Sequence, residues 1–312
     1  MGAQLRVIRG RIRSARAMGK ITHAQELIAS SRIITAQRRA AASAPYAREI
    51  TRAVSALISY HPDIDHPLLV ERSDARRAAM LLLTSDGGFC GGFNANLLRE
   101  GEALAAKLRD EGKEPVIYVA GRKGIGWYRF RGRDIEREWS GFSGNPSYDR
   151  AEQIGQALVA AFSRPEEDGG VGEIHVVYTE FVSMLSQRPV IHRIVPLEVE
   201  EVEEGQETGE AGEAAAGGAL PLYEFEPSPE EVLDRLLPSY IENRIWHMLL
   251  QSAASEHAAR QRAMKSATDN ANELVETLTR QANQARQAEI TTEISEIVGG
   301  ANALAAATAE SE

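Results

Sequence analysis

Residues 239–298 read SYIENRIWHMLLQSAASEHAARQRAMKSATDNANELVETLTRQANQARQAEITTEISEIV, sixty residues with neither Pro nor Gly. As one helix they would extend about 90 Å, roughly twice the width of a compact domain of this mass. Just upstream, Ser228-Pro229-Glu230-Glu231 has the form of a helix N-terminus, with Ser at the cap and Pro in the first turn. Pro238 is expected to kink or interrupt the helix. A helix of this length needs a partner from elsewhere in the chain.

The amino-terminal residues are the predicted partner. Residues 3–58 contain a single proline, Pro45, and their apolar residues recur in steps of three and four. The predicted buried stripe comprises Leu5, Ile8, Ile12, Ala15, Ile21, Leu27, Ile28 and Ile34. Both terminal segments also carry Ala at helical spacing, and small side chains let two helix axes approach closely. The pattern predicts a long antiparallel coiled coil between the two ends of the chain.

The middle of the chain alternates between strand and helix patterns. The expected strands are 78–85, 115–120, 173–181 and 189–199, and the expected helices are 94–108 and 149–162. This alternation predicts an α/β fold with a mostly parallel sheet. The predicted division is an amino-terminal shaft helix at 1–60, an α/β domain at 74–200, an acidic flexible loop at 200–220 and a carboxy-terminal shaft helix at 228–312.

Charge is distributed unevenly along the chain, whose net charge is −10. Thirteen acidic residues and no Lys or Arg lie between Ile194 and Asp234, whereas residues 1–52 hold eleven Lys or Arg and two acids. The basic start has the composition of a mitochondrial presequence, but its periodicity continues past residue 50, which favours a structural helix.

No apolar run is long enough to span a bilayer. The single cysteine, Cys90, excludes an internal disulfide and fits a reducing compartment.

A glycine-rich segment, TSDGGFCGGFN at Thr84–Asn94, follows a predicted strand and precedes a predicted helix, where phosphate-binding loops occur. A P-loop would need Lys and then Ser or Thr after its last Gly, whereas this chain has Phe93 and Asn94. The segment Gly121–Gly126 is typical of a strand-to-helix turn. We interpret both as tight turns rather than nucleotide sites. Cys90, alone in such a turn, is interpreted as packing rather than as a nucleophile.

Two further patterns have structural interpretations. The segment His61–His66, HPDIDH, holds two prolines and is interpreted as a connecting loop rather than a metal site. The basic amino-terminal helix lacks the interleaved aromatic residues that stack on bases, so its charges are assigned to a solvated or partner-facing surface. No catalytic residue, cofactor or metal site is therefore expected, and no nucleic acid is expected as a partner.

The residues at both ends and in the centre resemble the γ subunit of rotary F-type ATP synthases. The resemblance lies in Lys20-Ile21-Thr22, in residues 29–31 and 42–46, in Thr84–Asp86 with Cys90–Asn94, and most closely in residues 254–260, 263–271, 285–291 and 293–300. It covers nearly the whole chain, in the right order. Residues 23–27 depart from the family, because Gln25 stands where the family has a Met that faces the β subunit.

The resemblance implies an architecture and a set of partners. Two terminal helices would pair as a shaft, with a Rossmann-like α/β domain at its foot. The shaft would sit inside a ring of three α and three β subunits, and the foot would contact the ε subunit and the membrane ring of c subunits. The protein would be a bacterial-type, peripheral protein on the cytoplasmic side of the cell membrane. It would perform no chemistry itself. Its rotation would couple proton flow to ATP synthesis and hydrolysis at the β subunits.

Coupling requires polar groups that meet the ring at certain angles only. By resemblance, the candidate contacts are Lys20, Gln25, Arg260, Arg286, Gln287, Thr291, Glu293 and Glu296. Residues 297–309 carry no charge and are mostly small, as suits a tip that turns inside an apolar sleeve. Two other classes of protein stay open: a nucleotide-binding α/β enzyme with helical extensions, and a coiled-coil scaffold or nucleic-acid adaptor.

Overall fold

The computed structural model describes residues 2–61, 66, 68–69, 75–196 and 228–309. The chain forms two compact units, one made of Met1–Ile28 with Gln261–Glu312 and the other of Ala29–Arg260. The four-part division expected from the sequence stays a prediction, and its acidic loop lies outside the described residues. No helix within the described ranges has the length and hydropathy that a bilayer span requires.

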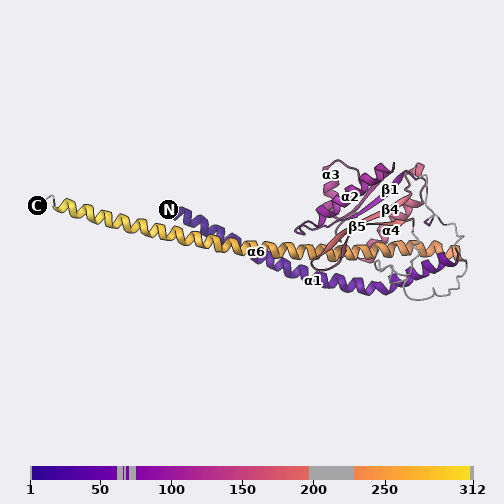
Figure 1. Ribbon diagram of the computed structural model, residues 1–312, viewed down its shortest axis with the longest axis horizontal. Helices are drawn as coiled ribbons and strands as arrows, with labels where there is room; N and C mark the ends of the chain where they lie inside the picture. The colour runs from indigo at the N-terminus through magenta and orange to yellow at the C-terminus, as the bar shows by residue number, and fades with distance from the viewer. Residues whose placement is uncertain (1, 62–65, 67, 70–74, 197–227, 310–312) are drawn as a thin grey trace. The chain divides into compact units, whose positions relative to one another are not determined.

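Two long helices account for both ends of the chain. Helix α1 comprises Gly2–Tyr60 and helix α6 comprises Pro229–Ala309 (Figure 1). Pro238 lies inside α6, so of the two expected outcomes, a kink or an interruption, the interruption is wrong and the kink stays a prediction. The physical reason lies in the residues around it: Leu233, Leu237 and Ile241 are each fully buried in the core of the second unit. Their burial stabilises the helical path and offsets the hydrogen bond that proline cannot donate.

The second unit contains a five-stranded sheet in the order β3-β2-β1-β4-β5. The strands are β1 (Arg77–Leu83), β2 (Glu114–Ala120), β3 (Arg137–Trp139), β4 (Glu173–Phe181) and β5 (Gln187–Val195). Strands β1 to β4 are parallel, and β5 is antiparallel to β4. In the central pair, Met80 is the register partner of Ile117. The first five strands of a Rossmann sheet have this order, so the predicted α/β class is confirmed; β5 differs in its direction.

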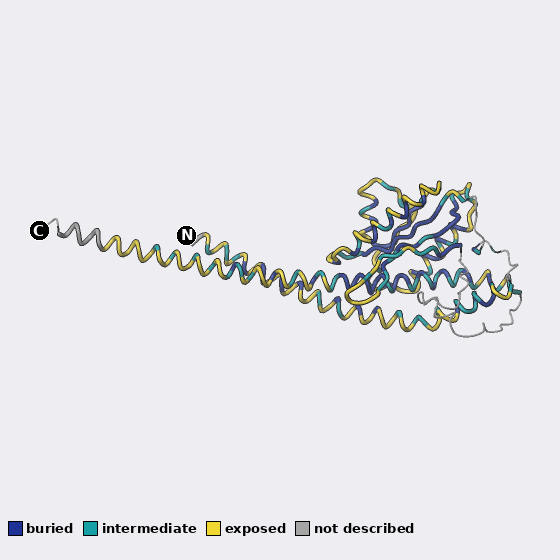
Figure 2. Tube along the Cα trace, in the orientation of Figure 1, coloured by how far each residue is buried: buried dark blue, intermediate teal, exposed yellow. Residues whose placement is uncertain are grey.

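Helices cover both faces of this sheet. They are α2 (Phe93–Asp110), α3 (Arg122–Phe130) and α4 (Tyr148–Ser163), and a short 3₁₀ turn, Glu166–Asp168, follows α4. Side chains of α2 and α3 pack with Met80 and Leu82 on one face. Side chains of α4 and of the first turns of α6 pack with Leu81 and Leu83 on the other. Because β1 is buried on both faces, it consists almost entirely of apolar residues (Figure 2).

The structure corrects the predicted buried stripe of α1. Its first half is buried or half-buried, but Ile21, Leu27, Ile28 and Ile34 are 58, 59, 46 and 50% exposed. Apart from Gly10 and Ser30, the buried or half-buried residues between positions 5 and 36 instead alternate in steps of three and four: Leu5, Ile8, Ile12, Ala15, Gly19, Thr22, Glu26, Ala29, Ile33 and Ala36. Several of these are small or polar, so a search for large apolar residues misses them.

Candidate functional site

The first unit is an antiparallel pair of helices. The hydroxyls of Thr22 in α1 and Thr268 in α6 lie 2.7 Å apart, within hydrogen-bond distance. One turn earlier in α1, a Cβ added at Gly19 would lie 3.5 Å from the Cβ of Ala271. Residue numbers fall in α1 as they rise in α6, so the helices run in opposite directions. The small side chains at this contact allow the close approach.

Helix α6 presents a matching row to α1. Among its buried and half-buried residues, one row alternates in steps of four and three: Met264, Thr268, Ala271, Val275, Leu278, Ala282, Ala285, Glu289 and Thr292. Other half-buried residues, Gln261, Ala263, Ala267, Thr277 and Thr279, lie beside this row. Both rows therefore have a mean period of 3.5 residues. Near the far end of the pair, Leu5 and Glu289 line the same groove, and α1 begins at Gly2. Residues 293–309 of α6 consequently continue beyond the end of α1 (Figure 1).

Large apolar side chains are exposed on the outer sides of this pair. On α1, Met18 and Ile21 are 57 and 58% exposed, and Ile28 follows two turns later. On the part of α6 that continues beyond α1, Ile294 and Ile297 are 56 and 71% exposed. Within each helix these residues are spaced so that they lie on one face, and on α1 the row is interrupted at Gln25. Contiguous exposed apolar surface of this kind marks a protein contact.

Seven of the eight predicted contact residues lie on the first unit, and all seven are exposed. They are Lys20, Gln25, Arg286, Gln287, Thr291, Glu293 and Glu296. Gln25 occupies the gap in the exposed apolar row between Ile21 and Ile28. The eighth residue, Arg260, lies in the second unit and has a different environment.

Arg260 is held inside the second unit, with 13% of its side chain exposed. Its guanidinium donates to Glu256 Oε1 at 2.6 Å and to the carbonyl oxygen of Gly88 at 3.2 Å. A third bond, of 3.2 Å, goes to Nδ1 of His257. These three side chains of α6, which we call the Arg260 cluster (Glu256, His257 and Arg260), join the helix to the glycine-rich segment.

His257 is almost completely buried, with 1% exposed. Because Arg260 can only donate, Nδ1 of His257 accepts, and Nε2–H then donates to the carbonyl oxygen of Gly144 at 2.8 Å. Burial lowers the pKa of His257, and the positive charge of Arg260 adds to this, although the bond to Gly144 and the charge of Glu256 oppose it. The hydrogen-bond geometry and the lowered pKa both indicate that the imidazole of His257 is neutral, and the hydrogen bonds place its proton on Nε2.

The glycine-rich segment is closed by its own side chains. Asn94, at the start of α2, accepts the backbone N–H of Ser85 at 2.9 Å and donates to Ser85 Oγ at 2.8 Å and to Cys90 Sγ at 3.2 Å. Ser85 Oγ in turn donates to the carbonyl oxygen of Gly87. The polar side chains of Ser85 and Asn94 are therefore used within the loop. Cys90 is buried among them, whereas Phe89 is 80% exposed and has a φ of 59°.

Asp86 fixes this segment against two neighbouring loops. Its carboxylate accepts the backbone N–H groups of Gly141 at 2.8 Å, Ser143 at 2.9 Å and Arg122 at 3.1 Å. Burial alone would raise the pKa of Asp86, but these donors outweigh it and the pKa is lowered. The carboxylate is thus a structural acceptor, held ionised at neutral pH.

Sequence reasoning missed the polar residues that attach α6 to the sheet. Ser252 Oγ donates to the carbonyl oxygen of Leu83 at 3.3 Å, and Ser255 Oγ donates to that of Thr179 at 3.0 Å. Both serines are buried and both carbonyls lie in or at the ends of strands. The available signal was the presence of small polar residues at one helical face within an otherwise apolar segment.

The part of the chain that is described holds no group of His, Cys, Asp and Glu suited to a metal ion. Of the predicted loop at 61–66, residues 62–65 lie outside that part.

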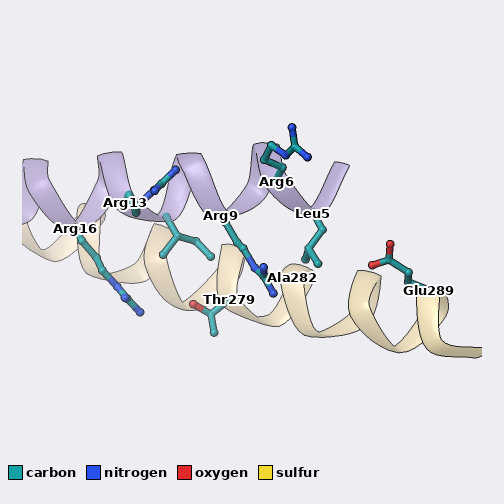
Figure 3. A pocket seen from close by; sticks show the side chains of 9 residues that line it. Leu5, Arg6, Arg9, Arg13, Arg16, Thr279, Ala282 and Glu289 are labelled. Atoms are coloured by element: carbon teal, nitrogen blue, oxygen red, sulfur yellow. The ribbon is translucent and has the colours of Figure 1, made fainter. Parts of the chain in front are cut away.

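A groove of about 670 Å³ lies along the helix pair of the first unit. Its wall on α1 carries four arginines, Arg6, Arg9, Arg13 and Arg16, beside Leu5 and Ile12. The wall on α6 consists of Thr279, Ala282 and Glu289. Figure 3 shows Arg9 and Arg16 reaching toward the side of α1 that faces α6, whereas Arg6 points away.

Comparison with known proteins gives consistent similarities in sequence. A family model described as ATP synthase matches residues 4–304. The ATP synthase gamma chain of Acidothermus cellulolyticus is 60% identical over 310 residues, which cover 99% of this chain and 100% of that protein. The ATP synthase gamma chain of Thermobifida fusca is 59% identical over 312 residues, and both chains are covered completely.

Solved structures give a matching similarity in fold. A chain in the mitochondrial ATP synthase of Euglena gracilis superposes with a TM-score of 0.66 at 15% identity, covering 99% of this chain and 97% of its own length. A chain in the central stalk and c-ring structure of the Tetrahymena thermophila enzyme gives a TM-score of 0.57 at 19% identity, covering 79% and 99%.

Proposed function

The chain belongs to the ATP synthase gamma chain family, and on that premise we propose that it is the central rotor shaft of the F1 sector of a proton-translocating ATP synthase. Its proposed partners are the α and β subunits, which surround the helix pair, and the ε subunit and c-ring, which the second unit contacts. It performs no chemistry and works as a peripheral subunit at the cytoplasmic side of the cell membrane. Its rotation couples proton flow to ATP synthesis and hydrolysis at the β subunits.

One observation carries this proposal. The helix pair buries small residues such as Gly19 and Ala271 between its helices and leaves large apolar residues such as Ile21, Leu274 and Ile290 on its outside. A helix pair that functioned alone would bury the large residues, because burying an Ile side chain contributes about 1.5–3 kcal/mol. The exposed rows fit a shaft that a sleeve of other subunits covers. The mean period of 3.5 residues in both buried rows supports a coiled coil within that sleeve.

Co-purification tests the proposal directly. The complete chain, expressed with the α and β subunits of the same organism, should elute with them as one complex from a native extract. A chain that elutes by itself, or with other proteins only, would contradict the shaft function.

The contact residues on α6 should affect coupling more than assembly. Arg286 and Gln287 are exposed residues of α6 that lie beyond the close contact between α6 and α1. A guanidinium binds a carboxylate in a fixed geometry, so the strength of such a contact depends on the angle between the two groups. Changing both residues to Ala should therefore lower ATP synthesis by reconstituted vesicles while the yield of intact complex stays normal. Normal synthesis at normal yield would show that neither residue is a coupling contact.

A further inference from the structure

The guanidinium of Arg260 lies directly against the glycine-rich segment. Its Nε donates to the carbonyl oxygen of Gly88 at 3.2 Å, and a Cβ added at Gly87 would lie 3.0 Å from its Nη2. Cys90 belongs to the same segment and packs with Ala259, the neighbour of Arg260 in α6. The position of Arg260 therefore determines how closely the segment lies against α6.

His257 holds this guanidinium in place by accepting a hydrogen bond from it. Nδ1 of His257 lies 3.2 Å from Nη1 of Arg260, and Nε2 lies 2.8 Å from the carbonyl oxygen of Gly144. Because a guanidinium has donors only, its bond to Nδ1 exists only while Nδ1 carries no proton. A proton on Nδ1 would place two donors and two positive charges 3.2 Å apart.

The charges that act on His257 come from two helices. Arg260 in α6 and Arg32 in α1 disfavour a positive imidazole, whereas Glu256 in α6 favours it. Glu256 is already bonded to Arg260, at 2.6 Å, and the loop on the other side of the ring offers a neutral carbonyl oxygen. Asp86, the carboxylate of the glycine-rich segment, is bonded to backbone N–H groups of neighbouring loops instead. A proton on His257 is therefore poorly compensated while Arg260 holds the segment.

We propose that the Arg260 cluster is a proton-sensitive link, in which protonation of His257 releases Arg260 from Gly88 and lets the glycine-rich segment separate from α6. After release, the imidazolium is hydrated and Arg260 keeps its ion pair with Glu256. Cys90, which is 3% exposed, becomes accessible to solvent. All of these groups lie in the second unit, so the link does not depend on the shaft function.

Proton linkage sets the size and the sign of the effect. In the released state the imidazole is in water, where its pKa is about 6.5. If the ring takes up its proton only on release, the released fraction rises as pH falls, by about tenfold between pH 7.5 and pH 5.5. Above pH 7.5 the released fraction is constant, because the ring is then neutral in both states.

The reactivity of Cys90 measures this release, because Cys90 is the single cysteine of the chain. The rate of its reaction with dithiodipyridine is determined for the complete chain and divided, at each pH, by the rate for the chain unfolded in urea. This ratio removes the effect of thiol ionisation and should rise about tenfold from pH 7.5 to pH 5.5. It should change little at low urea concentrations, because a local opening exposes little surface.

Three variants separate the link from other effects of pH. His257→Gln keeps a donor and an acceptor but takes up no proton, so its Cys90 ratio should stay constant over this range. The matched control, His23→Gln, removes an exposed histidine of the first unit and should keep the tenfold rise. Arg260→Gln removes the link itself, so its ratio should be high at both pH values. Circular dichroism and urea unfolding check that each variant is folded.

Several results would overturn the proposal. A constant ratio in the unchanged chain would show that no release occurs, and an equal rise in His257→Gln and His23→Gln would assign the release to another group. A rate that climbs steeply with urea from the lowest concentrations would report global unfolding. If His257→Gln does not fold, the ¹⁵N resonances of the His257 ring in the unchanged chain decide instead. Protonation of the ring without a parallel rise in Cys90 reactivity would then contradict the link.

Discussion

At the scale of single residues, Gly121 is a position where the fold tolerates little change. Its φ is +105°, and a Cβ there would lie 2.2 Å from the carbonyl oxygen of Thr84. Gly121→Ala should therefore lower the free energy of unfolding by about 3 kcal/mol or more, since both backbone strain and a clash with main-chain atoms oppose it.

The matched control is five residues further on. A Cβ at Gly126, in helix α3, would meet nothing within 4 Å. Gly126→Ala should leave stability unchanged or raise it by up to about 1 kcal/mol, through helix propensity. Urea unfolding compares the stabilities of the two variants. Similar unfolding midpoints for both would contradict a clash between a Cβ at Gly121 and the carbonyl oxygen of Thr84.

His257 should make stability depend on pH. Its pKa is lowered in the folded chain, while in the unfolded chain it stays near 6.5. Between these two values the unfolded state binds more protons, so stability is fully present above about pH 6.5 and is lost as pH falls through the folded pKa. His257→Gln keeps one donor and one acceptor and should show a smaller loss of stability between pH 8 and pH 5.5.

The chosen pH range lies above the range in which Glu173 titrates. Burial opposes ionisation of Glu173, but hydrogen bonds and charge interactions with His175 and Lys113 lower its pKa to about 2. Its contribution is present above its unfolded pKa of about 4.5 and is lost as pH falls from there toward 2. Equal pH dependence of the original chain and of His257→Gln between pH 8 and 5.5 would show that His257 is not the titrating group.

At the scale of elements, Gly19 sets how closely α1 and α6 approach. An added methyl group would make an ordinary contact, at 3.5 Å, with Ala271. Gly19→Ala should therefore raise the stability of the helix pair by up to about 1 kcal/mol, whereas Gly19→Leu should lower it because a large side chain pushes the helices apart. Thermal unfolding, followed by the circular dichroism of the helices, tests whether the two substitutions change stability in opposite directions. A loss of stability in both variants would show that the contact between Gly19 and Ala271 leaves no room for an added methyl group.

The predictability of the elements followed from two kinds of signal. The absence of Pro and Gly predicted most of α6, and alternating patterns predicted β4 at its observed bounds and α2 and α4 to within two residues. Strand β3, with three residues, is too short to leave a pattern and was not predicted. The seam of α1 was assigned wrongly beyond Ala15 because hydrophobicity favours Ile21 and Leu27, whereas close helix packing selects Gly19 and Thr22.

The candidate contacts were less predictable than the elements. Gln25, Arg286 and their exposed neighbours could be named only by resemblance, because exposure by itself does not identify a binding residue. Arg260 has the same charge as Arg286, but its bonds to Glu256 and Gly88 form only once α6 packs beside the glycine-rich segment. Contacts between residues this distant in sequence leave no local pattern. A coupling role for Arg260 stays a prediction.

At the scale of the whole molecule, the exposed apolar rows should matter for assembly and not for folding. Changing Ile294 and Ile297 to Ser should leave thermal unfolding of the complete chain nearly unchanged, since both side chains are already mostly in water. The same variant should give a lower yield of complex with the α and β subunits. Leu278→Ser, at a position that is 6% exposed, is the control and should lower the stability of the chain itself. Normal assembly of the Ile294 and Ile297 variant would show that this row is not covered by partners.

The extension of α6 beyond α1 has a mechanical consequence. Residues 293–309 form a single helix of about 25 Å, while the preceding part of α6 is braced by a second helix. A lone helix bends and twists more readily than a braced pair, because no neighbouring side chains resist the deformation. Under a torque applied to the pair, deformation would concentrate in this last segment, and its angle would lag behind that of the braced part. The end of α6 would then act as a spring that stores part of each applied twist and releases it when the load falls.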